Sequence, residues 1–288
     1  MQKYNYTDFL VSDIHSFYTP LRTCLKEAGF NPKDKTHRLI ILGDIFDRGS
    51  ETLEVYKFIK SLPKHRRILI KGNHEQLYFE LLEKIFPDEY DFSNGTVKTF
   101  CHIAGIDPDE LNIKLLAKTY YAQQETPPRE YLRKKVEYIW AQVKALVEVH
   151  EITEWLRSNE WVDYYEYNNL ICVHSFIPIV LSATRDWREA HASEWDDARW
   201  GCPWKLFNTG LFNKEIINNN ILVCGHWHAQ EFHEVYERVS NNWELYFGKN
   251  LIALDGCCAL TGKIPVLKVT SEGFFDRFGN KLEASEND

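Results

Sequence analysis

Short apolar runs alternate with amphipathic segments along the first third of the chain. Runs at residues 7–12, 38–42 and 67–70 are rich in aliphatic side chains and predict three strands. Between them, apolar side chains recur every three to four residues, as in helices that cover a sheet. Strands that alternate with helices favour right-handed βαβ units, and therefore a buried, largely parallel sheet.

Capping residues mark the ends of the two helices between these strands. We expect Thr19 to cap the first helix, Pro20 to occupy its first position and Gly29 to end it. Ser50 is expected to cap the second helix.

Four more strands are predicted later in the chain, at residues 170–173, 221–224, 251–254 and 264–269. Polar residues typical of catalytic and metal sites follow several of the predicted strands directly. In parallel α/β sheets, ligands bind at the carboxyl ends of the strands. We therefore expect the polar segments at these ends to form one site.

The segment 111–159 has a mainly helical pattern. Its apolar positions, which follow an interruption at Pro127 and Pro128, are Leu132, Val136, Ile139, Val143 and Leu146. We interpret this segment as a helical cap inserted into a single domain that spans residues 1–288. The pattern as a whole predicts an α/β fold.

The composition is that of a globular protein, with 44% hydrophobic and 26% charged residues among 288. No uncharged apolar stretch reaches the length of about 18 residues that a membrane span needs, so no membrane partner is expected. The N-terminus lacks the charged-then-apolar plan of a signal peptide, which predicts a cytoplasmic protein. Seven cysteines without a CxxC spacing are expected to be reduced thiols rather than ligands of a structural zinc ion.

The formal net charge is −8, and no stripe of lysine and arginine offsets it. Such a surface repels nucleic-acid backbones, so no nucleic-acid partner is expected. A phosphorylated substrate would need a local positive centre, which bound dications supply.

Five polar segments carry the candidate chemistry. They are Asp13-Ile14-His15, Gly43-Asp44-Ile45-Phe46-Asp47-Arg48-Gly49, Gly72-Asn73-His74-Glu75, His174 and Gly225-His226-Trp227-His228. Side chains two residues apart in an extended chain point the same way, so Asp13 and His15 are expected to face one metal ion. The same holds for His226 and His228 if the turn between them stays extended.

Carboxylate, imidazole and amide donors together suit Mn²⁺, Fe²⁺ or Zn²⁺ better than Ca²⁺. A carboxylate can bridge two ions, and Asp44, central in the order of motifs, is the candidate for this role. Two ions roughly 3.5–4 Å apart hold a hydroxide and grip phosphoryl oxygens, which gives in-line attack of the hydroxide on phosphorus. We expect two divalent ions, with Mn²⁺ as the first choice.

These motifs resemble those of the calcineurin-like metallophosphoesterases. Gly-Asp-Ile-Phe-Asp-Arg-Gly followed by Gly-Asn-His-Glu-Gln is similar to the phosphoprotein phosphatase branch, which includes Ser/Thr phosphatases of the phage lambda type. The likeness covers residues 9–82 and resumes at 170–174, 195–200 and 221–269. It implies a layered β-sandwich flanked by helices.

The resemblance also implies a role for each motif residue. It assigns Asp13, His15 and Asp44 to the first metal, and Asp44, Asn73, His174 and His226 to the second. His74 would be the general acid that protonates the leaving oxygen, held by Asp47. The residues alone agree, because nearby dications oppose a charge on His74 while a carboxylate partner restores its proton affinity.

Two arginines are implied as phosphate ligands, because a guanidinium fork matches two phosphate oxygens. The first is Arg48. The second is expected after residue 174, where Arg199 matches best and Arg185 and Arg188 compete with it.

The chain departs from the family's pattern at two positions. Ser16 stands where the family usually has Gly, so its Cβ narrows the turn or shifts the loop. The second histidine of the last motif, here His228, is usually missing in the phosphatase branch but occurs in the wider superfamily. Its presence suggests a fourth protein ligand on the first metal.

Three functions follow from these observations. The leading hypothesis is a phosphomonoesterase that acts on phosphoserine or phosphothreonine of a protein, or on small phosphoesters. The alternative is a symmetrical dinucleoside tetraphosphatase or another nucleotide phosphodiesterase, with Tyr120, Tyr121, Tyr131, Tyr138 and Trp140 available to contact a base or to pack between helices. A remote third is a non-catalytic interaction protein, although such a protein would be expected to lose motif residues that are intact here.

Overall fold

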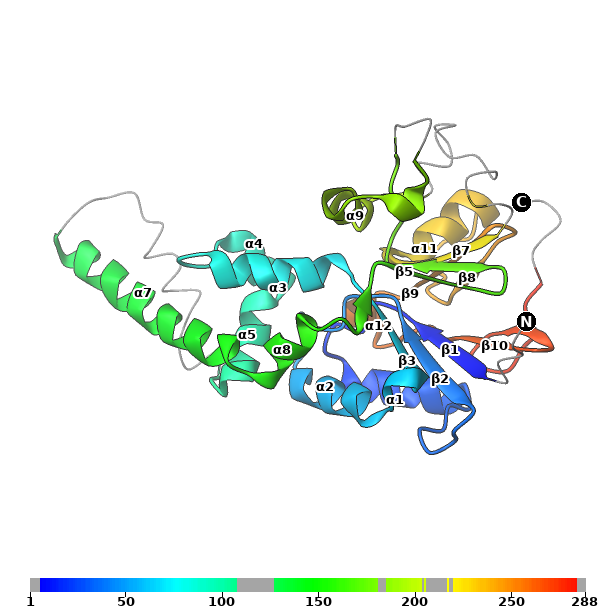
Figure 1. Cartoon of the computed structure of the whole chain (residues 1–288), viewed down its shortest axis with the longest axis horizontal. Coiled ribbons are helices and arrows are strands. Elements are labelled where there is room, and N and C mark those ends of the chain that lie inside the picture. The colour runs from blue at the N-terminus through cyan, green and yellow to red at the C-terminus, as the bar shows by residue number, and fades with distance from the viewer. Residues whose placement is uncertain are drawn as a thin grey trace.

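Two β-sheets lie face to face, and helices cover both outer faces (Figure 1). This computed structural model describes residues 6–107, 127–180, 185–203, 205, 217 and 220–283. The predicted α/β fold, a layered β-sandwich flanked by helices, is confirmed, and the parallel sheet expected from the strand–helix alternation contains β1, β2 and β3.

The first sheet contains the three N-terminal strands of the prediction. Its order is β11-β10-β1-β2-β3-β4, and β1, β2, β3 and β4 run parallel while β10 is antiparallel to β1. The strands are β1 (Thr7–Val11), β2 (His37–Ile41), β3 (Arg67–Ile70), β4 (Trp161–Val162), β10 (Leu267–Thr270) and β11 (Gly273–Phe275).

The second sheet is built from the later strands, in the order β5-β6-β7-β9-β8. Its strands are β5 (Tyr164–Tyr167), β6 (Leu170–Val173), β7 (Ile221–His228), β8 (Tyr246–Phe247) and β9 (Leu251–Asp255). Strands β6, β7 and β9 run parallel, so this sheet too has a set of carboxyl ends at one edge. The carboxyl ends of β1, β2, β3 and β6 lead into four of the polar segments, as predicted. The fifth, Gly225-His226-Trp227-His228, forms the last residues of β7, which extends beyond the predicted end at residue 224.

Alternating side chains of the two sheets form the core between them. Leu10 and Ile40 of the first sheet belong to one buried cluster with Cys172, Val223 and Ile252 of the second. Their neighbours along each strand face the helices instead, because successive strand side chains point to opposite faces. The two sheets, each of which carries polar segments at its strand ends, therefore share one hydrophobic core.

The first two helices begin and end close to the predicted positions, but their capping residues differ from the predicted ones. Ten helices lie in the described part of the chain. They are α1 (Tyr18–Glu27), α2 (Thr52–Ser61), α3 (Asn73–Glu83), α4 (Glu89–Asn94), α5 (Thr96–Ala104), α7 (Pro127–Glu148), α8 (Glu151–Leu156), α9 (Ala192–Ala198), α11 (Ala229–Phe232) and α12 (Cys258–Thr261), with short turns η1 (Lys64–Arg66), η2 (Trp187–Glu189) and η3 (His233–Glu237). In the described part of the chain, none of them has the length and apolar character to cross a membrane.

The predicted caps at Thr19 and Ser50 are wrong. Helix α1 already begins at Tyr18, and the Thr19 hydroxyl donates to Glu51 Oε1 at 2.5 Å. Helix α2 begins after Glu51 without a side-chain capping bond. Gly29 follows α1 in the left-handed region with φ 84°, as expected of a helix terminator.

The helical segment packs on the rest of the molecule through α7. The buried face of α7 is Val136, Trp140, Val143 and Val147, in the same cluster as the side chains beneath the first sheet. The ring of Trp140 stacks on Phe100 of α5 at 5.8 Å. Helices α4 and α5 precede the predicted boundary at residue 111, and residues 111–126, with Tyr120 and Tyr121, lie outside the described residues.

Trp140 is therefore a packing residue rather than a contact for a base. Tyr131 and Tyr138 are 69% and 65% exposed. Leu146, one of the apolar positions of the predicted helical pattern, is 49% exposed. The buried face of α7 is thus shifted by one residue from the predicted apolar positions, because Trp140 and Val147 pack against α5 and its neighbours in place of Ile139 and Leu146. The assignment of 1–288 to one domain stays a prediction.

Replacing Trp140 tests whether α7 shares the stability of the sandwich. Trp140→Ala removes a fully packed ring and should lower the free energy of unfolding by about 3–5 kcal/mol. Tyr138→Ala, on the exposed side of the same helix, should change it by no more than about 0.5 kcal/mol. Urea denaturation followed by tryptophan fluorescence and by circular dichroism measures both. A separate, earlier transition confined to the helical segment would contradict the one-domain interpretation.

Candidate metal centre

The five polar segments meet where the carboxyl ends of the two sheets adjoin. His174, after β6, donates from Nδ1 to the carbonyl of Leu42, after β2, at 2.7 Å. The amide of His226, in β7, donates to Asp13 Oδ2 at 2.9 Å. These bonds join loops more than a hundred residues apart, so the site depends on the packing of one sheet on the other.

The loops hold an unusual concentration of left-handed backbone. Of eleven non-glycine residues with positive φ in the described chain, seven belong to the motif loops: Asp13, His15, Ser16, Asp44, Asp47, Arg48 and His226. Each such residue costs about 1–2 kcal/mol relative to ordinary backbone and persists only where its surroundings hold it. This strain is typical of functional loops.

The expectation of extended chain through Asp13 and His15 is therefore wrong, although the side chains still converge. Their φ values are 51° and 49°, and Asp13 Oδ1 lies 3.9 Å from His15 Nε2. Ser16 adopts φ 59°, and its hydroxyl is hydrogen bonded to Thr52 Oγ1 at 3.0 Å. The turn thus accommodates a serine where glycine was expected.

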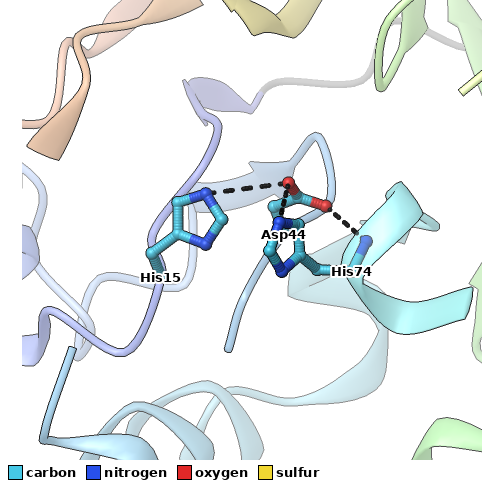
Figure 2. A group of neighbouring side chains, drawn as sticks. All are labelled: His15, Asp44 and His74. Carbon is cyan, nitrogen blue, oxygen red and sulfur yellow. Dashed lines mark hydrogen bonds and ion pairs between the residues drawn. The ribbon is translucent and has the colours of Figure 1, made fainter. Parts of the chain in front are cut away.

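One group of possible metal donors consists of His15, Asp44 and His74, whose ligand atoms lie within 4.8 Å of one another. Figure 2 shows the Asp44 carboxylate between the two rings, with His74 at the start of α3. Asp44 Oδ2 lies 3.7 Å from His15 Nε2 and 3.8 Å from His74 Nε2. All three residues are buried.

A second group consists of Asp44, His174 and His226, again within 4.8 Å. Asp44 Oδ1 lies 3.4 Å from His174 Nε2, and Asn73 Oδ1 lies 2.8 Å from the same nitrogen. Asp44 therefore belongs to both groups and faces them with different oxygens, as a bridging carboxylate would.

The orientation of the rings fits a cation. His15 Nδ1 is bonded to the Phe46 carbonyl at 2.9 Å, as His174 Nδ1 is to that of Leu42. A neutral imidazole has one N–H, so the donor at Nδ1 leaves a lone pair on Nε2. The Nε2 of His174 then faces the oxygens of Asn73 and Asp44, and three electron-pair donors crowd together. A dication among them would convert this repulsion into attraction, so the residues present fit such an ion.

For His15, His226 and Asp44, burial and neighbouring charges favour the protonation states that metal ligands need, whereas burial raises the pKa of Asp13. Burial, with His174 nearby, lowers the pKa of His226 to about 3. Burial and the neighbouring His74 hold the pKa of His15 well below its usual range. Burial alone would raise the pKa of Asp44, but the surrounding imidazoles, above all His174, outweigh it and lower that pKa.

His74 is paired with Asp47, as the sequence predicted. Its Nδ1 lies 2.6 Å from Asp47 Oδ2, while Nε2 faces the Asp44 carboxylate. Burial disfavours a charge on the ring, but Asp44 and Asp47 together raise the pKa of His74 to about 9. His74 can thus hold a proton on the nitrogen that faces the donor groups.

The two predicted phosphate-binding arginines differ in their surroundings. Arg48 is exposed at the mouth of the site, and among the described residues its guanidinium has no hydrogen bond or ion pair. Arg199 is buried and pairs with Asp163 at 2.5 Å and with Asp196. Its competitors are paired too, Arg185 with Glu194 and Arg188 with Glu166. A phosphate role for Arg199 stays a prediction.

His228 lies outside both donor groups. Its Nε2 is 3.7 Å from Asp255 Oδ2, and its Nδ1 is 3.8 Å from Glu231 Oε1. The turn before it is not extended, because His226 has φ 62° and the register of β7 shifts between Cys224 and His228. The condition for a joint site of His226 and His228 is not met, and a ligand role for His228 stays a prediction.

Glu75 is a structural residue of the site to which the sequence analysis gave no role. Its carboxylate accepts the amides of Gly72 at 2.7 Å, Asp44 at 3.0 Å and Ile45 at 3.0 Å. It thereby holds the loop of Asp44 against the start of α3. A Cβ at Gly72 would lie 2.1 Å from Asp44 Oδ1, so only glycine allows this approach. The capping-box spacing from Gly72 to Glu75 was the available signal.

Comparison with known proteins agrees with this arrangement. A family model described as calcineurin-like phosphoesterase matches residues 9–230. The fold is similar to that of a cold-active protein tyrosine phosphatase from a psychrophilic Shewanella, with a TM-score of 0.51 and 17% identity over 96% of this chain and 79% of that one. At this identity the likeness concerns the fold alone.

Curated relatives match only a short part of the chain. A symmetrical bis(5'-nucleosyl)-tetraphosphatase from Buchnera aphidicola subsp. Acyrthosiphon pisum (strain Tuc7) is 42% identical over 67 residues, 23% of each chain. The protein with the same name from Legionella pneumophila (strain Lens) is 40% identical over 68 residues, 24% of each chain. The match thus spans about a quarter of these relatives.

The family model extends over more than half of the 288 residues and includes all five motif segments. The sandwich, the two donor groups around Asp44 and the His74–Asp47 pair accord with it. The chain belongs to the calcineurin-like phosphoesterase family.

Proposed function

We propose that this protein is a phosphomonoesterase of the Ser/Thr phosphatase type that depends on two divalent metal ions. The observation that carries the proposal is the Asp44 carboxylate, which belongs to both groups of donors. Asp13, His15 and Asp44 would hold one ion, and Asp44, Asn73, His174 and His226 the other. When bound, the ions supply positive charge to the phosphoryl oxygens and acidify a coordinated water.

The chain's own residues would bind the phosphate and deliver a proton. Arg48 offers an exposed guanidinium fork that has no hydrogen bond or ion pair among the described residues, and this fork suits two oxygens of a terminal phosphate. His74 would donate its Nε2 proton to the leaving oxygen, since Nδ1 is engaged by Asp47. The similarity of residues 43–49 and 72–76 to the phosphoprotein phosphatase branch supports a monoester substrate.

A symmetrical dinucleoside tetraphosphatase is the second candidate. The curated relatives with this name support it, although they match only about a quarter of the chain. Of the five aromatic residues considered for a base contact, Tyr131 and Tyr138 on α7 are exposed in the described structure and would be available to meet a base.

A substrate comparison tests the proposal. With Mn²⁺, a phosphoserine peptide should be hydrolysed with a kcat/KM at least about tenfold above that for diadenosine tetraphosphate, since one terminal phosphate suffices for Arg48. Released phosphate and nucleotide are measured by chromatography. The reverse preference would favour the second candidate, and no hydrolysis of either substrate or of p-nitrophenyl phosphate with any divalent ion would refute both.

Asp44→Asn tests the shared ligand. Loss of one anionic oxygen should weaken both metal positions, so metal analysis after dialysis should find fewer than two ions per chain. The kcat should fall further than in a variant of a residue that would hold only one of the ions. Asp34→Asn is the control and should retain both ions, because this partly exposed carboxylate lies in the turn before β2, at the opposite end of that strand from Asp44. Two ions retained in Asp44→Asn would argue against bridging.

His74→Asn separates the acid from the ligands. Loss of a general acid should reduce kcat by about 10²–10⁴-fold while both ions stay bound. Steady-state kinetics and metal analysis of the same preparation give the two quantities. A variant that turns over like the wild type would remove His74 from the mechanism, and one that loses an ion would make His74 a ligand.

A further inference from the structure

The Asp47 carboxylate is held by a helix that lies outside the motif segments. Thr96 Oγ1 of α5 donates to Asp47 Oδ2 at 2.8 Å, and Thr99 Oγ1 donates to Oδ1 at 2.7 Å. All three side chains are at most 1% exposed. Both oxygens of Asp47 are therefore engaged, and water does not compete for them.

The hydrogen bonds leave Asp47 a single orientation. The Thr99 hydroxyl accepts the amide of Asp47 at 3.0 Å, so its own proton must point to Asp47 Oδ1. Oδ2 then receives Thr96 on one side and His74 Nδ1 on the other. The plane of the carboxylate, and with it the direction of the bond to His74, is set by two threonines one helical turn apart.

Helix α5 is itself fixed against the motif loop. Gly95, which precedes it, has φ 88°, and a Cβ at this position would lie 2.3 Å from the amide nitrogen of Arg48. Lys98 Nζ donates to the Arg48 carbonyl at 3.2 Å. The first turn of α5 thus contacts both Asp47 and Arg48, and its partial positive charge favours the carboxylate beside it.

We propose that Thr96 and Thr99 are positioning residues that aim the His74 imidazole at the leaving group through Asp47. The proposal rests on the proposed function, in which His74 is the general acid. Both threonines lie outside the five motif segments, on helix α5, so the helical part of this chain would contribute directly to the geometry of catalysis.

The role concerns one proton. In hydrolysis, a water oxygen forms a bond to phosphorus, and the bond from phosphorus to the ester oxygen breaks with its electron pair on that oxygen. His74 Nε2 gives its proton to this oxygen and takes up another from solvent. Of the water's two protons, one stays on the phosphate and one leaves to solvent, so an alcohol and inorganic phosphate result. A misdirected ring slows this transfer only when the leaving oxygen is basic enough to need the proton.

The leaving group therefore distinguishes positioning from general damage. Thr99→Val should reduce kcat for phenyl phosphate and a phosphoserine peptide about tenfold, and Thr96→Val/Thr99→Val about 10²-fold, below the loss in His74→Asn. Both should change kcat for p-nitrophenyl phosphate, whose leaving group is weakly basic, by no more than about threefold. Thr96→Ser and Thr99→Ser keep the hydroxyls and should restore the rates.

Thr153→Val is the matched control. Thr153 is a fully buried threonine of α8 whose hydroxyl donates to the Val147 carbonyl at 2.6 Å and accepts from the Tyr78 hydroxyl of α3 at 2.5 Å, without a bond to Asp47. It should lower stability similarly but reduce all substrates' rates equally or not at all. Equal losses for all leaving groups in the Thr99 variant, or the same leaving-group dependence in Thr153→Val, would overturn the proposal.

A spectroscopic measurement is independent of activity. In the Zn²⁺-loaded protein, the Nδ1 proton of His74 should give a downfield NMR signal that is absent from His74→Asn. Thr99→Val should shift or broaden this signal, and Thr153→Val should leave it unchanged. An unchanged signal in Thr99→Val would overturn the positioning role. If no phosphoester is hydrolysed by the wild type, the proposed function fails, and the NMR result alone decides whether the threonines orient the ring.

Discussion

The site depends on keeping one carboxylate ionised in the interior. Asp44 is 1% exposed, and its burial would by itself favour the neutral acid. Imidazoles from both sheets surround it, and the amide of His74 donates to it at 3.0 Å. Glu75 holds the backbone on either side of it. These contacts come from β2, α3, β6 and β7, so the carboxylate can sit there only if the whole sandwich is assembled.

The fold followed from the sequence where the pattern was local. The strands at 67–70 and 170–173 were predicted to the residue, because apolar runs end there in Lys71 and His174. Division into two sheets left no local signal, since the central strands of both, such as β1, β2, β6 and β9, are buried on both faces and look alike. The capping errors at Thr19 and Ser50 have a similar cause, because Glu51 competes for Thr19 across the tertiary structure.

The site shows the same division. The position of Asp44 after a predicted strand placed it at the site, and the resemblance to the family implied the pairing of His74 with Asp47. Motif spacing missed Thr96 and Thr99, because a threonine on a helix carries no chemical pattern by itself. Neither did spacing reveal that His228 lies outside both donor groups, next to a residue with positive φ, His226. Backbone strain is decided by the packing of neighbours, which a single chain of letters does not contain.

The close approach of Gly95 to the backbone of Arg48 has a consequence for evolution and engineering. A helical segment that only covered a pocket could be exchanged between relatives as a cassette. Here the start of α5 packs so closely against the motif loop that no methyl group fits at Gly95. The hydroxyls of Thr96 and Thr99 also bond to Asp47 of that loop. A chimaera that imports another helical segment would have to carry glycine and both hydroxyls in the same register. Sequence change in this region is therefore constrained where the start of α5 packs against the motif loop.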